Sequence, residues 1–189
     1  MRVSPHRLSL AYAPAHDAAN TMPLEPNNQR LLTAAQGFLE LGLPLDANNE
    51  IESMDADVRH LPEVLAVRVG IYRALNAWPL MQVVARQLAL YAPDEPDWTV
   101  AWAFATRRAD SLDAARLILV NAVERLPGVA VFAFNLACYE AQLGDVASAK
   151  AHLSRRPHQS IFRSFEAVSN KPRGSSTRPQ PMTAGILCG

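Results

Sequence analysis

The chain has 189 residues, of which 49% are hydrophobic and 19% are charged. These proportions fit one globular or repeat-built domain with enough apolar side chains for a core, and they exclude wholesale disorder. No apolar run approaches the roughly 20 residues that a membrane helix needs, and the apolar stretch at residues 8–13 is too short for a signal peptide. The chain is therefore expected to be soluble and cytoplasmic, with no membrane partner.

The 18 basic and 18 acidic residues balance only in the sum. Residues 28–154 hold 10 Lys or Arg and 15 Asp or Glu, a net charge of 10 − 15 = −5, whereas residues 155–189 hold 6 − 1 = +5. Nucleic-acid binding normally requires a basic face on the folded domain itself, so the acidic body predicts no nucleic-acid partner. Residues 157–189 are rich in Pro, Ser and Arg, and they are expected to form a largely disordered tail.

Similar residues recur at intervals of 34 positions along the middle of the chain, and such a period is typical of repeat architectures. Candidate turn residues follow this interval at Gly42, Asn76, Asp110 and Gly144. Small residues follow it at Ala35, Ala103 and Ala137, and again at Ala47, Ala115 and Ala149. The interval divides the chain into units 28–61, 62–95, 96–129 and 130–163, with the last unit truncated. Each unit is predicted to consist of two short helices joined by a turn.

The expected helix ends carry suitable residues. Ser111 and Asp145 are predicted to cap the start of second helices, because their side chains accept hydrogen bonds from backbone N–H groups there. Pro62 and Pro96 are predicted at the start of first helices, where the missing N–H costs little. These positions agree with the helix boundaries that the repeat interval predicts.

These residues resemble the tetratricopeptide repeat family, whose 34-residue unit is a helix–turn–helix. The first unit departs from the family pattern with Arg59 at the position of the closing proline, and the second has Met81 and Leu88 at both alanine positions. The resemblance covers about residues 28–156, and it implies an all-α fold in which antiparallel helix pairs form a right-handed superhelix, an α-solenoid. The best matches lie in the third and fourth units, at Ala115, Ala122, Pro127, Leu136, Ala137, Gly144 and Ala149.

Both ends of this array depart from the pattern. Residues 1–27 are expected to be a disordered N-terminal extension. Residues 155–157 read Arg-Arg-Pro and interrupt the helical periodicity, so the last helix is predicted to be short. A solenoid usually needs a capping segment over the apolar face of its final repeat. If no such segment covers it, the end of the last helix pair is expected to fray. Candidates for a short amphipathic segment that folds back over the array are Ile161, Phe162, Phe165 and Val168.

No sequence pattern predicts catalysis or a cofactor. The five His form no metal-ligand spacing, and the eight Gly form neither a phosphate loop nor a dinucleotide fingerprint. Cys138 and Cys188 lie far apart in the sequence (188 − 138 = 50), which gives no metal spacing and no disulfide framework, so they are expected to be free thiols. Acidic pairs at unit junctions, such as Asp55 and Asp57, are expected to lie in solvated loops. The chain is therefore predicted not to be an enzyme, and to hold no cofactor or metal.

The resemblance implies a concave surface made by the first helices, which in this family binds an extended peptide or a helix of a partner protein. For Phe104 and Phe134 the alternative is ordinary packing. For Arg107 and Arg108 it is a solvated helix end, and for Cys138 a small buried apolar position. By family offset, the candidates for the partner-binding groove are Arg73, Phe104, Arg107, Arg108, Phe134, Asn135, Cys138 and Gln142.

The predicted function is that of a non-catalytic protein–protein interaction module, a scaffold or adaptor. The alternative is a small chaperone that holds a client protein, as in tetratricopeptide-type secretion chaperones. Some family members clamp the C-terminal carboxylates of chaperones with Lys and Asn, but Ala66 and Gly70 stand at those offsets, so such binding is not predicted. The excess of Arg, with 16 against 2 Lys, indicates a GC-rich genome and hence a bacterial origin.

Overall fold

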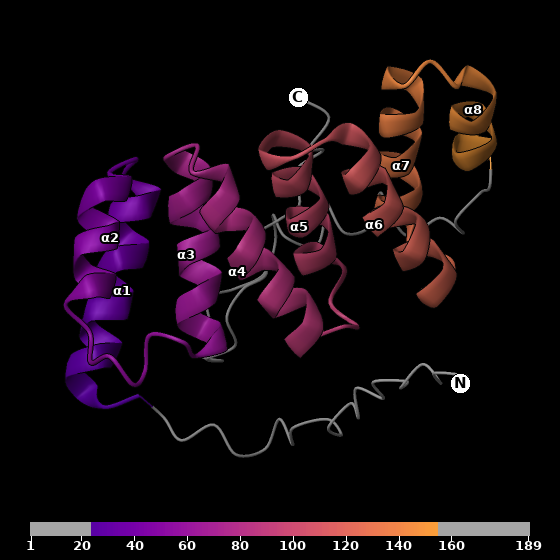
Figure 1. The fold of residues 1–189 in the computed structure, drawn as a ribbon. Coiled ribbons are helices and arrows are strands. Elements are labelled where there is room, and N and C mark those ends of the chain that lie inside the picture. Colours follow the sequence, from indigo (N-terminus) through magenta and orange to yellow (C-terminus); the bar gives the residue numbers. More distant parts are fainter. Residues whose placement is uncertain (1–23, 155–189) are drawn as a thin grey trace, which may run out of the picture.

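The computed structural model describes residues 24–154, and this part of the chain is entirely helical, without a strand (Figure 1). The predicted all-α class is therefore confirmed. The predicted tail, and the predicted extension up to residue 23, lie outside the described residues. The helices are α1 (Pro26–Glu40), α2 (Pro44–Glu52), α3 (Pro62–Ala74), α4 (Trp78–Tyr91), α5 (Pro96–Ala109), α6 (Leu112–Arg125), α7 (Ala130–Gln142) and α8 (Val146–Ser154).

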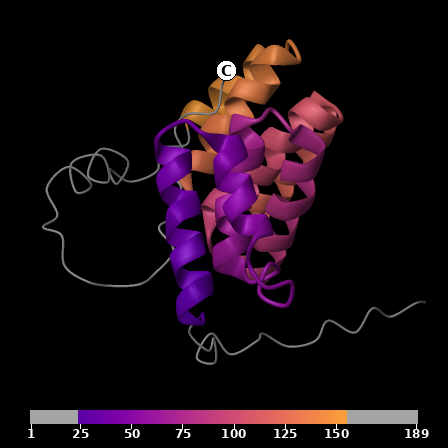
Figure 2. The same cartoon turned by 90° about the vertical axis from the view of Figure 1, so that its left-hand side faces the viewer.

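Each helix packs on the next one along the chain, so the molecule is built from hairpins that follow one another (Figure 1). Viewed from the side of α1 and α2, the later hairpins lie behind the first (Figure 2). The first helix begins at Pro26, slightly before the predicted boundary at 28. Helix starts recur at a constant interval (78 − 44 = 34 and 96 − 62 = 34): the second helices begin at Pro44, Trp78, Leu112 and Val146, and three first helices begin at Pro62, Pro96 and Ala130.

Three hairpin turns close the preceding helix with the same hydrogen bond. In each, a backbone N–H donates to the carbonyl oxygen five positions earlier, and the preceding residue has a left-handed conformation, with φ of 74° at Gly42, 55° at Asn76 and 87° at Gly144. Glycine adopts this conformation without a steric penalty and Asn tolerates it, which explains why these residues end the helices. The bonds run from Leu43 to Phe38 (2.9 Å), from Ala77 to Tyr72 (2.8 Å) and from Asp145 to Glu140 (2.9 Å).

The third hairpin has a shorter turn. Asp110 lies in it as predicted, but with φ of −129°, so no left-handed residue is used there, and α5 continues to Ala109. Ser111 then caps α6, its hydroxyl accepting the N–H of Ala114 at 3.1 Å. The predicted cap at Ser111 is therefore confirmed.

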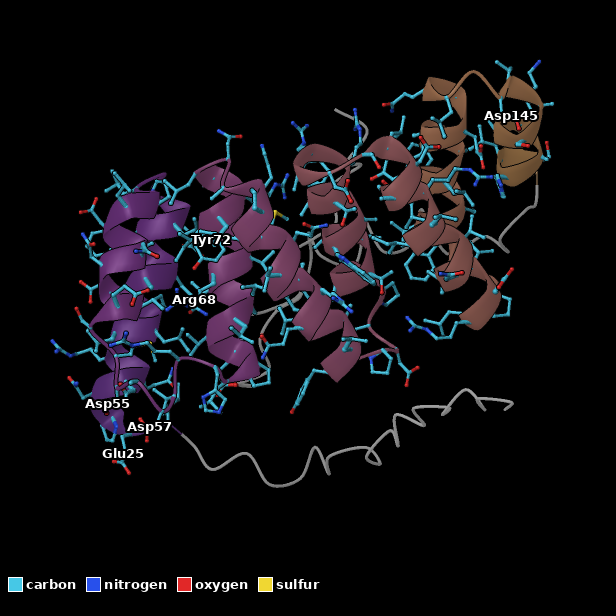
Figure 3. The ribbon with its side chains drawn as sticks, in the orientation of Figure 1. Glu25, Asp55, Asp57, Arg68, Tyr72 and Asp145 are labelled. Atoms are coloured by element: carbon cyan, nitrogen blue, oxygen red, sulfur yellow. The ribbon has the colours of Figure 1, made fainter. Side chains whose placement is uncertain are left out.

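Asp145 caps α8 at the far end of the array (Figure 3). Its Oδ1 accepts the N–H of Ser148 at 2.9 Å, and its Oδ2 accepts the hydroxyl of the same serine at 2.7 Å. These bonds favour the ionised carboxylate, so they hold the pKa of Asp145 below its usual value. The predicted cap at Asp145 is therefore also confirmed.

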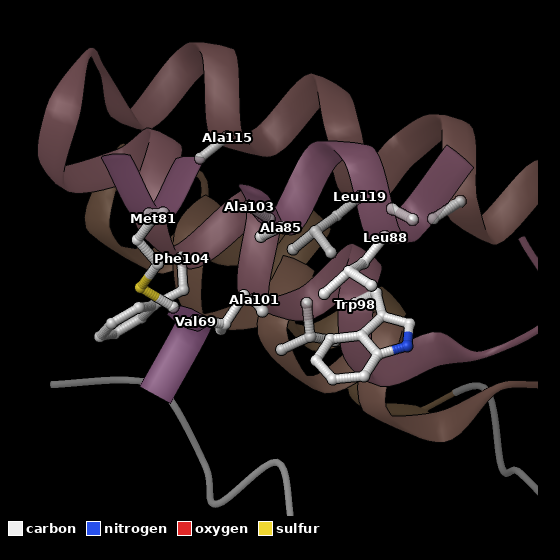
Figure 4. Close-up of a cluster of buried hydrophobic side chains, with 14 of the residues drawn as sticks. Val69, Met81, Ala85, Leu88, Trp98, Ala101, Ala103, Phe104, Ala115 and Leu119 are labelled. Atoms are coloured by element: carbon white, nitrogen blue, oxygen red, sulfur yellow. The ribbon is translucent and has the colours of Figure 1, made fainter. Parts of the chain in front are cut away.

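The largest core cluster extends from α3 to α7 (Figure 4). Ala103 on α5 and Ala115 on α6 both belong to it, with 1% and 0% of their surface exposed. Small residues at these positions allow two helices of one hairpin to approach closely, as the spacing of the alanines predicts. A second cluster joins α1, α2 and α3 around the fully buried Ile51 and Ile71. The helix pairs are thus held by apolar packing within and between hairpins.

Two glycines provide a test of the turn geometry. Gly37 lies inside α1 and Gly144 in the last turn, and a Cβ added at either would meet nothing within 4 Å. Gly37→Ala is expected to stabilise the fold by about 0.4–1 kcal/mol, because alanine loses less backbone entropy. Gly144→Ala is expected to destabilise it by about 1–2 kcal/mol, because a side chain disfavours the left-handed region. Urea unfolding of the two variants checks this, and equal midpoints would contradict the turn assignment.

Candidate interaction surface

Arginine side chains lie over aromatic rings where α3, α4 and α5 meet. The guanidinium carbon of Arg73 is 5.9 Å from the ring centroid of Phe104, and that of Arg108 is 4.6 Å from the same centroid. Arg108 also lies 4.8 Å from the ring centroid of Trp78. The two rings meet edge to face, with centroids 5.6 Å apart and an interplanar angle of 83°. These four residues are named the arginine–aromatic cluster.

Local helix geometry explains how the cluster forms. Phe104 and Arg108 are one helical turn apart on α5 (108 − 104 = 4), so they share one helix face. Arg73 lies in the last turn of α3, and Trp78 begins α4 directly after the turn at Asn76. Arg73 and Arg108 both stand near helix C-termini, where the helix dipole favours a positive charge. One turn and one interhelical contact therefore bring the four side chains together.

A second arginine–ring contact extends the surface towards α7. The guanidinium carbon of Arg107 is 5.8 Å from the ring centroid of Tyr139. Burial raises the pKa of Tyr139 to about 12, and the charges of Arg107 and Arg108 act in the opposite direction without overcoming it. Tyr139 is only 1% exposed, so it remains a neutral part of the core at physiological pH. Arg107 is thus the residue of this pair that lies towards solvent.

The arginines of the cluster are suited to binding a carboxylate, and the partly buried ring of Trp78 offers apolar surface beside them. Arginine over an aromatic ring gains about 0.5–1 kcal/mol at an exposed site and about 2 kcal/mol when desolvated. Arg73 and Arg108 are both exposed, while Phe104 beneath them is 5% exposed. A guanidinium carries its N–H donors in one plane and in a fork that matches the two oxygens of a carboxylate. Packing on the rings limits the motion of the arginines, which lowers the entropy lost when a ligand binds.

Two predicted groove residues belong to the core instead. Phe104 and Asn135 are 5% and 1% exposed, so a partner does not reach their side chains directly. The burial of Phe104 agrees with the alternative given for this residue, which is ordinary packing. Asn135 donates from Nδ2 to the carbonyl oxygen of Val131 at 2.8 Å, while its Oδ1 has no hydrogen-bond partner. Both side chains support the first helices from within.

The remaining predicted residues lie on α7. Phe134 is partly buried and Gln142 is exposed at the C-terminal end of the helix. Cys138 is partly buried and disulfide-bonded, so the expectation of a free thiol is wrong at this position. The number and spacing of cysteines in a sequence do not reveal which sulfur atoms meet in space. The structure thus leaves Arg73, Arg108 and Gln142 exposed, and Arg107, Phe134 and Cys138 partly buried.

Sequence reasoning missed the aromatic partners Trp78 and Tyr139. Trp78 is the first residue of α4, and its contact with Arg108 joins distant positions of the sequence (108 − 78 = 30), so no helical spacing connects them. The signal available in the sequence was a large aromatic residue, Trp78, two positions after the predicted turn residue Asn76. The ion pair of Arg116 with Glu140 was also missed, with Nε and Oε1 2.6 Å apart. Such contacts depend on how neighbouring helices are aligned.

Acidic residues at the junctions serve structural roles. Asp55, near the end of the α1–α2 pair, accepts a hydrogen bond from Asn28 Nδ2 at 2.8 Å (Figure 3). In return, the backbone N–H of Asp55 donates to Asn28 Oδ1 at 3.1 Å. On the neighbouring helix Arg68 donates to the hydroxyl of Tyr72 at 2.9 Å and pairs with Glu52 at 2.8 Å. These contacts fix α1, α2 and α3 relative to one another.

No protein-family model, curated protein or solved structure matches the chain. Within residues 24–154, no three His, Cys, Asp or Glu side chains gather in a way that could hold a metal ion. None of the helices in this range combines the length and the apolar character needed to cross a membrane. The surface around Arg73, Arg107 and Arg108 is the candidate interaction site of the described residues.

Proposed function

We propose that this chain is a non-catalytic protein–protein interaction module, a scaffold or adaptor. It binds a peptide or helix of a partner protein in the concave groove of a tetratricopeptide-like array. The observation that carries the proposal is the arginine–aromatic cluster, in which Arg73 and Arg108 lie on Phe104 and Trp78. Exposed cations held on rings form a surface that recognises acidic and apolar groups together.

The recurrence of helix starts supports the repeat array. Second helices begin at a constant interval (112 − 78 = 34 and 146 − 112 = 34). The hydrogen bonds donated by the backbone N–H groups of Leu43, Ala77 and Asp145, which close the first helix of three hairpins, are spaced by 34 and by twice 34 positions. This period is the tetratricopeptide period, although the proposal rests on geometry because no family model matches. Four helix pairs with a constant offset between neighbours generate a right-handed superhelix in this proposal.

Contacts between alternate helices support a concave side made by first helices. Helix α1 packs on α3 and α5 packs on α7, while α3 and α5, like the second helices of neighbouring pairs, do not pack on each other to this extent. The first helices α3 and α5 are instead joined through the side chains of Arg73 and Phe104. In a curved array the elements on the inner side approach one another most closely. Arg73, Arg107 and Arg108 belong to α3 and α5, so the proposal places them on the inner side.

The charges around the arginines indicate which kind of partner segment would bind. Residues 28–154 carry a net charge of 10 − 15 = −5, so the arginines form a local basic area on an acidic body. An acidic partner segment is attracted to this area and repelled by the surrounding surface, which gives it one favoured position. The segment expected to bind therefore carries Asp or Glu side chains beside one or more apolar anchors.

The proposal predicts that charge reversal at the site weakens binding. A library of peptides that combine acidic and apolar residues provides the probes, with affinities measured by fluorescence polarisation. For the peptides that bind best, Arg107→Glu with Arg108→Glu is expected to raise Kd about tenfold or more, which equals about 1.4 kcal/mol. Circular dichroism should show unchanged helicity, because the substituted positions are not fully buried.

Matched controls separate the site from general charge effects. Arg86→Glu with Arg125→Glu changes the net charge by the same amount, at exposed positions on the second helices α4 and α6. This double variant should bind the peptides nearly as well as the unchanged protein. Arg173→Glu tests the C-terminal segment in the same way. Equal loss in the α4–α6 control, or loss only in Arg173→Glu, would move the binding site away from the first helices.

A holding chaperone is the second candidate, favoured by exposed apolar side chains on α4. Leu80, Val83 and Leu90 are 54%, 65% and 58% exposed, and a non-native client could bind to such residues. In that case Leu80→Ser with Val83→Ser should reduce the suppression of client aggregation. The arginine reversal should then have little effect in the same assay, so the two candidates give opposite results.

A further inference from the structure

One position of the second helices is buried in three hairpins and exposed in the fourth. Ile51 on α2, Ala85 on α4 and Leu119 on α6 are each 0% exposed. Leu153 on α8 is the equivalent position in the last hairpin (153 − 119 = 34), and it is 58% exposed. The sequence therefore keeps an apolar residue at this position even where the described structure leaves it uncovered.

The cover at the other positions comes from the next helix. Helix α2 packs on α3, α4 on α5, and α6 on α7, whereas no helix follows α8 within residues 24–154. Val146 lies seven positions before Leu153 on α8, so the two share one side of the helix, and Val146 is 53% exposed. Val146 and Leu153 are together named the terminal face.

We propose that residues 161–168 of this chain cover the terminal face. This segment carries apolar residues at positions i, i+1, i+4 and i+7, which lie on one side of a helix. The given sequence has 35 residues after α8 (189 − 154 = 35), so the segment follows in the same chain the helix that needs cover. Its apolar residues are Ile161, Phe162, Phe165 and Val168.

The connection has a suitable length. The stretch 155–160, six positions long, separates α8 from the segment. Neighbouring hairpins of this protein are joined by four positions at 92–95 and at 126–129, and by nine at 53–61. The connecting stretch falls between these values, so the segment can return to the α7–α8 hairpin as α3, α5 and α7 return to the hairpins before them.

Charge and tethering favour this segment over a second copy of the chain. Residues 155–189 carry +5 and residues 28–154 carry −5, so the C-terminal segment is attracted to the array. A segment joined through a short linker has an effective concentration in the millimolar range, well above that of a second molecule in dilute solution. The intramolecular occupant therefore outcompetes self-association at the terminal face.

Hydrogen exchange of the full-length protein tests the proposal, in buffer with a thiol reductant so that cysteine pairing does not contribute. Phe162→Asp with Phe165→Asp removes the apolar side of the segment. Exchange of the α8 amides is expected to become about tenfold faster, because loss of cover raises the frequency of local opening. Gln159→Asp with Asn170→Asp adds the same charge to the flanking residues, and it should leave α8 exchange unchanged.

The other outcomes overturn the proposal. If α8 exchanges equally fast in the unchanged protein and in both double variants, residues 161–168 do not cover the terminal face. If sedimentation shows a dimer that Leu153→Asp converts into a monomer, a second copy covers it instead. Unchanged exchange of the α1–α7 amides in every variant serves as the control for folding. Because no partner is added, the result is independent of peptide binding at the arginine–aromatic cluster.

Discussion

Leu119→Ala is expected to lower the free energy of unfolding by about 2–5 kcal/mol, the largest effect of a single substitution considered for this protein. Leu119 on α6 is 0% exposed and belongs to the core cluster that extends from α3 to α7. Alanine leaves a cavity that the surrounding helices fill only in part, so the lost packing adds to the lost transfer free energy. Urea unfolding followed by circular dichroism measures the change.

A matched control lies two positions away on the same helix. Leu117 is 56% exposed, and Leu117→Ala is expected to change stability by less than about 0.5 kcal/mol. The two variants share helix, chemistry and helix propensity, so their difference reports burial alone. If the two variants lost equal stability, Leu117 and Leu119 would be equally buried. This result would contradict the side of α6 that faces the core in the structure.

The same substitution links stability to the candidate site. Leu119 and Phe104 belong to one core cluster, and Phe104 lies under Arg73 and Arg108. A cavity at Leu119 should therefore loosen the support of the arginine–aromatic cluster. Peptide affinity is expected to fall less than for the charge reversal on α5, because the charges themselves remain.

Local signals in the sequence predicted the helices and most of the turns. Gly42, Asn76 and Gly144 ended helices in the left-handed conformation because glycine and asparagine adopt it more easily than other residues. Proline at Pro62 and Pro96 began α3 and α5 as expected, because the first turn of a helix leaves its N–H groups unpaired. These features depend on a few neighbouring residues, so a single sequence reveals them.

The candidate site was predicted only in part. Offsets along the first helices predicted Arg73, Arg107 and Arg108 as groove residues, and the structure leaves these side chains exposed or partly buried. The offsets could not show whether Phe104 and Asn135 face outwards or inwards. A small rotation of a helix decides which of its sides is buried, and that rotation depends on the packing of all its neighbours. Contacts between different hairpins are consequently visible only in the structure.

The ion pair between α6 and α7 illustrates such a contact. Arg116 Nε lies 2.6 Å from Glu140 Oε1, and the side chains are 35% and 4% exposed. Arg116→Met is expected to cost about 2–3 kcal/mol, because it leaves a buried carboxylate without its partner. This value lies at or below the lower end of the range for fully buried pairs, since Arg116 reaches water and is screened there.

Glu140→Leu is expected to cost less, about 1 kcal/mol or below, because Arg116 is the partner that can turn towards solvent. The double variant Arg116→Met with Glu140→Leu should regain most of the stability lost in Arg116→Met, since neither charge then remains buried. A double-mutant cycle from urea unfolding gives the coupling between the two positions. A larger loss for Glu140→Leu than for Arg116→Met would show that the carboxylate finds other polar partners between α6 and α7. The asymmetry of the two single variants therefore tests how the third hairpin packs on the fourth.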